Sequence, residues 1–296
     1  MPSCPACLYV VATPIGNLAD ITQRALDVLA GVDAILSENV GKTRRLLRHY
    51  GITTRVLSYR EENARRMGEV ALGLLASGKH VALVAEAGTP GVSDPGRQLV
   101  DAAWTGGFKV APIPGASAAI AGISVCGMKD ARFVFEGFLP RRRSKRRQRL
   151  EELSEEERPI IFFEAPHRIV ECLEDMRNSL GDRTCVVARE ITKLHEEIDK
   201  RRVSWFIAKY SAKKPLGEFV IICEGRDPAA AEGVDSGGHD LGAALEEALG
   251  LVKGGAKKKA AAKTVAKRYR LRSSDVYTAI RLAARNGRRE GGKSGG

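Results

Sequence analysis

The sequence has no long hydrophobic run. No apolar stretch in its 296 residues approaches the roughly 20 residues that a membrane-spanning helix needs. The first residues, MPSCPAC, also lack the basic start and the apolar centre of a secretory signal peptide. We therefore expect a cytoplasmic protein without a membrane-spanning segment.

Paired cysteines are also scarce. Of the six cysteines, those at positions 126, 172, 185 and 223 stand singly among apolar residues, as packed thiols do in a reducing compartment. Cys4 and Cys7 have the spacing of zinc and redox motifs, but no second cysteine or histidine pair stands near them. The histidines are too scattered to indicate ligands, so we expect no metal site.

Positive charge is abundant and concentrated. The formal net charge is +12 at pH 7, and lysine and arginine gather in residues 141–149, 253–272 and 281–289. Such clusters are typical of proteins that bind nucleic acid, because neutralising phosphates releases counterions. A solvated charged face is the alternative interpretation, but three separate clusters favour a polyanionic partner.

Three segments share one pattern, a strand followed by a Gly/Pro loop and a helix. The central one is residues 81–96, VALVAEAGTPGVSDPG, in which an apolar run ends at Glu86 and a loop follows. Asp94 and Pro95 predict the start of the next helix, as its N-cap and first residue. The pattern recurs at residues 8–29 and 110–125. If the strands are parallel, the three loops meet at one sheet edge, where open α/β sheets bind ligands.

Alternating strands and helices up to residue 127 predict a mostly parallel sheet. After residue 127 the strands and helices alternate less regularly, which predicts a second α/β domain with a mixed sheet. This domain includes a strand at 132–138, a basic loop at 139–149 that enters a charged helix, and a polar stretch up to residue 200. Residues 226–240 lack periodicity and indicate a linker. The fold class is therefore α/β, with predicted divisions at 1–127, 128–225, a linker at 226–240, a helical module at 241–290 and a disordered tail at 291–296.

The helical module carries much of the positive charge. Two of its helices, joined by a short turn at 270–272, resemble a helix-turn-helix whose basic face suits a phosphate backbone. A dimerisation or packing hairpin is the alternative interpretation.

Six motifs in order along the chain resemble those of the bacterial ribosomal RNA 2′-O-methyltransferase I family, whose members have the tetrapyrrole-methylase fold. The motifs are TPIGNLADIT (13–22), AGTPGVSDPG (87–96), PIPGASA (112–118), EGFLPR (136–141), FFEAPHR (162–168) and AREITKLHEE (188–197). The resemblance covers essentially the whole chain. One such motif would be weak, but the ordered set is specific.

The resemblance implies a two-domain methyltransferase, usually a homodimer, that binds S-adenosylmethionine between its domains. Its implied substrate is the 16S ribosomal RNA of the small (30S) subunit, methylated on the ribose of a decoding-centre cytidine. The implied cofactor-binding residues are Pro14, Ile15, Gly16, Glu86, Gly88, Thr89, Pro90, Ser117, Ala118, Phe163 and Ala188. Glycine loops and helix starts suit such a cofactor, because they let backbone amides approach it closely.

Transfer to a hydroxyl needs alignment and an acceptor for the hydroxyl proton. Glu38 and Glu164, each at the end of a strand, are the candidate catalytic residues, and either could instead be structural. The basic segments predict the RNA-binding residues Arg141, Arg142, Arg143, Lys145, Arg146, Arg147, Arg168, Lys258, Lys263 and Lys267. Arg44 and Arg189 are further candidates for holding phosphate.

Two departures from the family pattern stand close to these residues. The family usually has Asp-Thr-Arg after the glutamate of the second strand, where this chain has Asn39, Val40 and Gly41. It also has Ser-Asp before the central loop, where this chain has Ala85 and Glu86. These departures leave two alternatives open, a tetrapyrrole C-methyltransferase and an RNA-binding relative with altered catalysis.

Overall fold

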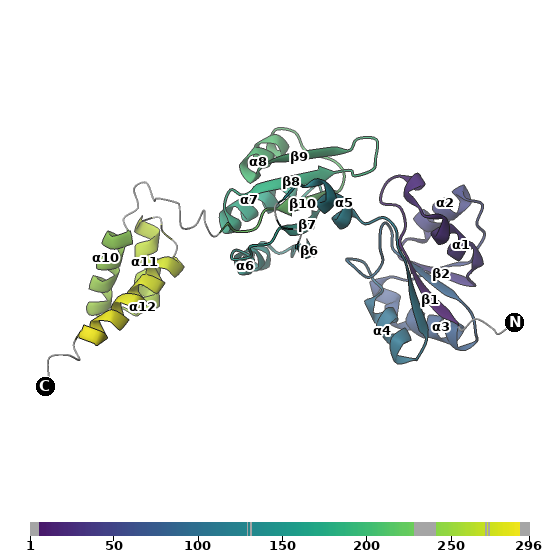
Figure 1. Cartoon of the computed structure of the whole chain (residues 1–296), viewed down its shortest axis with the longest axis horizontal. Coiled ribbons are helices and arrows are strands. Elements are labelled where there is room, and N and C mark those ends of the chain that lie inside the picture. Colours follow the sequence, from purple (N-terminus) through teal and green to yellow (C-terminus); the bar gives the residue numbers. More distant parts are fainter. Residues whose placement is uncertain are drawn as a thin grey trace. The chain divides into compact units, whose positions relative to one another are not determined.

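The computed structural model describes residues 6–128, 130, 132–227, 241–269, 271 and 273–290. The chain divides into two compact units, Met1–Arg226 and Asp227–Gly296 (Figure 1). The predicted linker and tail fall largely or wholly outside the described residues, as does Cys4. No helix within the described ranges is long and apolar enough to cross a membrane.

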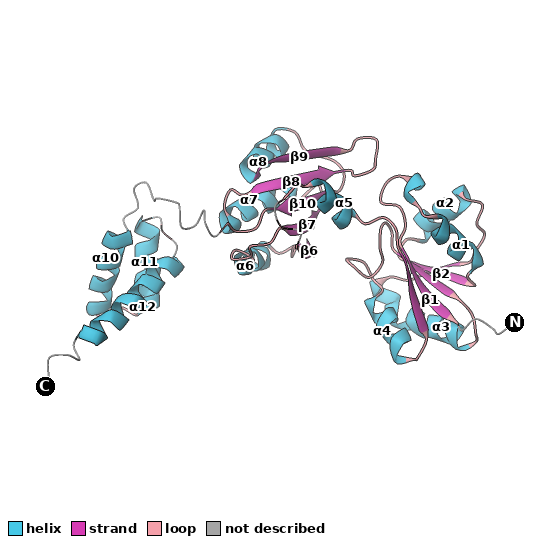
Figure 2. Ribbon diagram, viewed as in Figure 1, coloured by secondary structure: helices cyan, strands magenta, loops and turns pink. Residues whose placement is uncertain are grey.

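The first sheet of unit 1 is entirely parallel, with the strand order β3-β2-β4-β1-β5. Figure 2 shows its strands in magenta between helices. Its strands are β1 (Cys7–Val11), β2 (Ala34–Ser37), β3 (Val56–Ser58), β4 (Val81–Val84) and β5 (Lys109–Ile113). The accompanying helices are η1 (Leu18–Asp20), α1 (Gln23–Gly31), α2 (Val40–His49), η2 (Glu61–Asn63), α3 (Ala64–Ala76) and α4 (Arg97–Thr105). The parallel sheet predicted from the sequence is confirmed.

Helices cover both faces of this sheet. Leu83 of β4 packs in a core that includes residues of α3 and α4, whereas Ala82 and Val84 pack in a second core with residues of α1 and α2. Successive residues of a strand point to opposite faces, so a strand buried on both faces must be apolar throughout. This requirement explains why the central strand was readable as an uninterrupted apolar run.

The second sheet is mixed, with the strand order β6-β7-β10-β8-β9. Strands β6 and β7 are parallel, and the other neighbouring pairs are antiparallel. Its strands are β6 (Val134–Phe138), β7 (Ile160–Glu164), β8 (Thr184–Arg189), β9 (Glu197–Arg202) and β10 (Phe219–Cys223). Its helices are α5 (Ala118–Val125), α6 (Arg143–Glu152), α7 (Ile169–Leu180) and α8 (Val203–Ala212).

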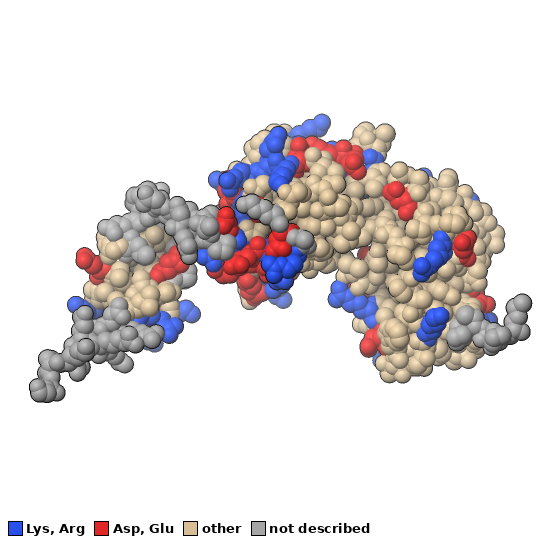
Figure 3. Space-filling model, viewed as in Figure 1, with Lys and Arg blue, Asp and Glu red and all other residues tan. Residues whose placement is uncertain are grey.

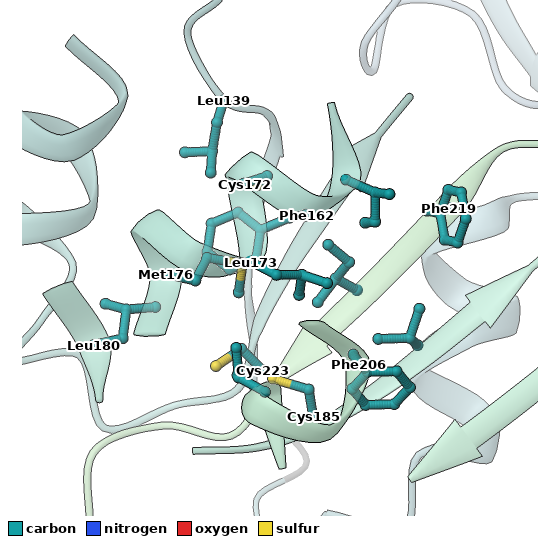
Figure 4. Close-up of a cluster of buried hydrophobic side chains, with 14 of the residues drawn as sticks. Leu139, Phe162, Cys172, Leu173, Met176, Leu180, Cys185, Phe206, Phe219 and Cys223 are labelled. Carbon is teal, nitrogen blue, oxygen red and sulfur yellow. The ribbon is translucent and has the colours of Figure 1, made fainter. Parts of the chain in front are cut away.

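The larger core of the second sheet lies under α6, α7 and α8. Phe162, Leu173 and Phe206 meet there, and Cys185 and Cys223 lie side by side in the same core (Figure 4). Cys126, Cys172, Cys185 and Cys223 are all buried free thiols, as their apolar surroundings predicted.

The opposite face of the second sheet is covered by α5. A Cβ atom on Gly122 of α5 would lie 3.0 Å from Ile222 Cδ1 and 3.1 Å from Val220 Cγ1, both on β10. The chain therefore passes from the first sheet to the second in the loop between β5 and α5, ahead of the predicted division at residue 127.

The described part of unit 2 is a set of three helices, α10 (Leu241–Lys253), α11 (Lys258–Tyr269) and α12 (Ser273–Glu290). Their common core consists mainly of small residues, with Ala244, Ala248, Val265 and Ile280 fully buried. The three helices match the predicted ones. The predicted turn at 270–272 lies mostly outside the described residues.

Three local predictions were wrong. Asp94 and Pro95 are not the N-cap and first residue of α4, because the N-cap is Gly96, with a φ of +144°, directly before Arg97. Residues 143–149 belong to α6 and are not a loop. The polar stretch before residue 200 includes the edge strand β9, which pairs only with β8. Its polar composition gave no period-2 signal, since most of its side chains face solvent.

Candidate functional site

A cavity of about 440 Å³ in unit 1 is lined by residues that follow strands of both sheets. The three Gly/Pro loops contribute to it as predicted, with Ile15 from the first loop, residues 86–89 from the central loop and residues 117–118 from the third. The second sheet contributes residues 163–166, 190–191, 193 and 218–220. The parallel strands of the first sheet explain why loops distant in sequence meet here.

Hydrogen bonds fasten the three loops to one another. The backbones of Thr13 and Gly88 form two hydrogen bonds of 2.9 and 3.0 Å, and Thr89 Oγ1 donates to the carbonyl oxygen of Ala116 at 3.3 Å. Gly88 has a φ of +77°, which only glycine adopts freely. The cavity wall is therefore a preformed cradle of backbone, of the kind that fits a small polar cofactor.

Replacing Gly88 with valine should weaken binding of S-adenosylmethionine by about tenfold or more. A β-branched residue is strained at this φ by about 1–2 kcal/mol, and its Cβ would lie 3.3 Å from Ile15 Cγ2 in the cavity wall. Calorimetric titration with the cofactor measures the effect. Gly51→Val, at a φ of +68° with open space around its Cβ, is the matched control, and cofactor affinity should be unchanged in it. Equal affinity in both variants would contradict the placement of the site.

The charged residues of the cavity lining are mostly acidic. They are Glu38, Glu86, Asp94, Glu164, Glu190 and Glu218, with Lys193 as the basic exception. Burial, and then the charges of Glu38, Glu86 and Glu218, raise the pKa of Asp94 to about 6. Burial and the charge of Glu86 raise the pKa of Glu38, whose Oε2 is buried without a hydrogen-bond partner. Such a site favours a cation, and S-adenosylmethionine carries a sulfonium and an ammonium.

Binding of S-adenosylmethionine should weaken as the pH falls through about 6. Asp94 is ionised above its pKa of about 6 and neutral below it, so the attraction between its carboxylate and the cationic cofactor is lost in acid. Calorimetric titration across this pH range measures the change. The Asp94→Asn variant should bind the cofactor with a flatter pH dependence. A wild-type affinity that stays constant from pH 5 to about 7 would contradict the prediction.

The two departures from the family pattern contact each other. Asn39 Nδ2 donates to Glu86 Oε2 at 3.0 Å, and Lys42 forms an ion pair with Glu86 Oε1. The hydrogen bonds from Lys42 and Asn39 lower the pKa of Glu86. An aspartate at position 39 would instead oppose Glu86 with a second carboxylate. The Asn39 amide and the Glu86 carboxylate therefore fit each other as a pair. Asn39 also caps α2, because its Oδ1 accepts a hydrogen bond from the Lys42 backbone amide at 3.1 Å.

Most of the predicted cofactor-binding residues meet at the cavity, but not all of them. The residues that line it are Ile15, Glu86, Gly88, Thr89, Ser117, Ala118 and Phe163. Pro14, Gly16 and Pro90 are not among the lining residues; a Cβ on Gly16 would clash with residues 191–193, so this glycine serves close packing between two loops. Ala188 is fully buried in the core beneath α5, where it is shielded from any cofactor.

Glu164 lines the cavity and also makes structural contacts, so its catalytic role stays a prediction. Its side chain is fully buried, Oε1 accepts from the Ala165 amide at 2.8 Å, and Oε2 lies 3.4 Å from Arg168 Nη2. The Arg168 guanidinium also donates to the carbonyl oxygens of Leu139 and Pro140. These contacts hold the loop after β7 and leave only 14% of the Arg168 side chain exposed, so its predicted contact with RNA stays a prediction.

The basic segment of α6 is largely neutralised by acids. Arg146 is 1% exposed, and its Nε and Nη2 donate to Asp175 Oδ2 at 2.9 and 2.7 Å. Arg143 and Arg147 bind the other oxygen of Asp175 at 3.2 and 2.7 Å. Blue and red side chains accordingly intermingle around α6 (Figure 3). The prediction that Arg146 captures RNA is therefore wrong, because its guanidinium is buried.

Burial does not contradict the other predicted RNA contacts. Arg141, Arg142, Lys145, Lys258 and Lys263 are exposed, and the side chain of Lys267 lies outside the described residues. Sequence reasoning missed Asp94 as a cavity residue, because its neighbour Pro95 made it resemble a helix cap. Its position inside the Gly/Pro loop was the available signal.

Comparisons with known proteins agree with this architecture. Residues 7–204 match the family model described as Tetrapyrrole (Corrin/Porphyrin) Methylases. A protein of Thermotoga maritima named "Ribosomal RNA small subunit methyltransferase I" is 44% identical over 220 residues, which are 74% of this chain and 99% of that protein. A Bacillus subtilis protein of the same name is 38% identical over 276 residues, covering 93% of this chain and 94% of its own length.

Among solved structures, the methyltransferase CobJ matches with a TM-score of 0.57 at 19% sequence identity. The match covers 74% of this chain and 94% of that one. At this identity the likeness concerns the fold.

Proposed function

Because this chain belongs to the tetrapyrrole methylase family and, within it, to the ribosomal RNA small subunit methyltransferase I group, we propose that it methylates the ribose 2′-hydroxyl of a decoding-centre cytidine in 16S ribosomal RNA. The chain is an S-adenosylmethionine-dependent methyltransferase of the small-subunit ribosomal RNA type. The cytidine, its 2′-oxygen and the decoding centre are parts of the proposal.

The observation that carries the proposed reaction is the unpartnered carboxylate oxygen of Glu38. Glu164 Oε2 also has no hydrogen-bond partner, but it lies beside the Arg168 guanidinium, which would hold it in the charged form. The Glu38 oxygen lies in the lining of the cavity formed by the cofactor loops, and burial raises the pKa of Glu38 toward the range in which a carboxylate is an effective proton acceptor. Methylation at oxygen requires such an acceptor, because the hydroxyl loses its proton when the new bond forms. In the proposed reaction the proton moves from the 2′-oxygen to Glu38 Oε2.

The described residues fit the cofactor. The Gly88 backbone and the Ser117–Ala118 helix start would hold its polar groups, and the acidic lining would stabilise its positive charge. When bound, S-adenosylmethionine supplies a methyl group on a sulfonium. Phe163, which packs edge-on against Phe135 and Phe138, adds an apolar wall that excludes water from the site.

An RNA substrate is favoured over a small tetrapyrrole. Corrin and porphyrin precursors carry several carboxylates, which the acids of the cavity lining would repel. An RNA strand instead places its phosphates on the surrounding protein surface and needs only one ribose in the cavity. The net charge of +12 and the exposed lysines of α11 support this choice.

We also propose a cytoplasmic homodimer that acts on the assembled 30S subunit. Ile120 and Val125 of α5 are each 54% exposed, and exposed apolar side chains on one helix support a subunit interface. The cytoplasmic location follows from the proposed ribosomal substrate.

Transfer of labelled methyl groups to small subunits that lack native modification tests the proposed function. Alkaline hydrolysis of the product should leave a labelled dinucleotide intact, because a methylated 2′-oxygen cannot attack the adjacent phosphodiester. Mass analysis of that dinucleotide identifies the nucleotide. Label in an alkali-sensitive product would place the chemistry on a base, and label on a tetrapyrrole but not on RNA would support the alternative substrate.

A further inference from the structure

Basic side chains cover the exposed surface of α2. Of its ten residues, Thr43, Leu46 and Leu47 are buried, and the helix has no acidic residue. Arg44, Arg45 and Arg48 are exposed, and at 3.6 residues per turn they fall within about 100° of one another around the helix. We call these three residues the α2 arginine face.

The α2 arginine face differs from the arginines of α6. Every arginine of α6 forms an ion pair with an acid, including Asp175, Glu171 and Glu136. Among the described residues, no side chain forms an ion pair with Arg44, Arg45 or Arg48. Their charge is therefore available to an external anion.

Contacts at both ends fasten α2 to segments around the cavity. In the first turn, Lys42 and Asn39 bind Glu86 of the central loop, which lines the cavity. Just beyond the last turn, the Tyr50 hydroxyl donates to the carbonyl oxygen of Leu18 in the first loop at 2.6 Å. With a rise of about 1.5 Å per residue, Arg44 and Arg45 lie about 3–5 Å from Lys42 along the helix axis, and Arg48 lies about 9 Å from it.

The charges of the cavity and of α2 are opposite in sign. An RNA strand that places one ribose in the acidic cavity has a phosphate on either side of that nucleotide. Because the carboxylates of the cavity repel these phosphates, the phosphates must lie outside it. The arginine fork binds phosphate in two-point geometry and keeps its charge at any physiological pH. The α2 arginine face supplies such groups on a helix that is fastened to two of the loops around the cavity.

We propose that the α2 arginine face binds phosphates of the RNA strand that flanks the target nucleotide. This inference rests on the proposed function and adds the surface that orients the substrate strand. In it, Arg44, Arg45 and Arg48 are positioning residues that bind the RNA backbone and do not touch the reacting atoms.

The test compares two triple variants that each remove three positive charges. The first is Arg44→Gln, Arg45→Gln and Arg48→Gln, because glutamine keeps the helix propensity of arginine. The control is Arg55→Gln, Lys79→Gln and Lys109→Gln. These exposed residues stand at the amino ends of β3, β4 and β5, the edge opposite the cavity loops. Binding to unmodified small subunits is measured over a salt series, together with KM, kcat and cofactor affinity.

The α2 variant should raise KM for the subunit about 10-fold to 100-fold and leave cofactor affinity unchanged. The slope of log affinity against log salt should become shallower by about 2, because each phosphate contact to a single strand contributes about 0.7. The control should keep the wild-type slope and KM. A third variant, with lysine at the three α2 positions, should recover most of the slope.

Equal slopes and KM values in the α2 variant and the wild type would overturn the proposal, as would equal losses in the α2 and control variants. A wild-type protein that binds subunits but transfers no methyl would refute the proposed function instead. In that case the salt slopes still decide whether α2 contacts RNA.

Discussion

Glu38→Gln should lower kcat for methyl transfer by about 10² to 10⁴-fold, the usual contribution of a positioned proton acceptor. Glutamine has nearly the same shape as glutamate, but its amide cannot take the proton from the 2′-hydroxyl. Binding of the cofactor and of the RNA should change little, so the loss should appear in kcat rather than in KM. Single-turnover transfer of labelled methyl, with both substrates saturating, measures the chemical step.

The pH profile separates this role from a general electrostatic one. In the wild type, kcat should rise with pH through the raised pKa of Glu38, because only the carboxylate accepts a proton. In Glu38→Gln that rising limb should disappear. Glu62→Gln is the matched control, because Glu62 is exposed and acts on Glu38 only through its charge. If kcat is unchanged in Glu38→Gln, Glu38 is not the proton acceptor, and methyl transfer depends on another acceptor or on positioning.

Glu164 gives a second comparison. Its carboxylate binds the Ala165 amide and faces Arg168 inside the protein, so Glu164→Gln should reduce stability without removing a limb of the pH profile. A loss of kcat in Glu164→Gln at full stability would assign the acceptor role to Glu164.

The sequence predicted the parallel sheet and the meeting of its loops because both depend on local patterns. Residues 81–84 must be apolar on two faces, and Gly88 must be glycine for its φ of +77°. Such requirements appear directly in the residue types. The resemblance to a family then supplied the cofactor, which the loops alone would have left as an unspecified ligand.

Other features depend on partners that are distant in the sequence. The basic run at 141–149 looked like an RNA-binding loop because Asp175, which neutralises three of its arginines, is about 30 residues away and was not recognisable as a partner. Ala188 looked like a cofactor contact because it begins a motif near the end of a strand, but it is buried in the core that α5 covers. Net charge predicted an anionic partner without showing which arginines were free to bind it.

Asp175→Ala should lower the free energy of unfolding by about 3–5 kcal/mol, the cost of leaving buried charges without their partner. The Asp175 side chain is fully buried and accepts hydrogen bonds from Arg143, Arg146 and Arg147. Without it, the Arg146 guanidinium remains in the core between α6 and α7 with only the 3.4 Å contact to Glu171. Urea unfolding measures the loss, and Glu174→Ala, which removes a neighbouring half-exposed acid, should cost under about 1 kcal/mol.

Two further measurements test whether the buried charge is the cause. Burial alone would raise the pKa of Asp175, but hydrogen bonds from Arg147, Arg146 and Arg143 outweigh it and lower the pKa. The stabilisation is therefore complete above the unfolded pKa of about 3.9 and is lost as the pH falls through the lower folded value, so the difference between wild type and variant should shrink in strong acid. Replacing Arg146 and Asp175 together with Met and Leu should restore much of the stability, because no unpaired charge then remains in the core. If the double variant is as unstable as Asp175→Ala, the loss of unfolding free energy comes from packing. The ion pairs between the arginines of α6 and Asp175 would then not be what stabilises this core.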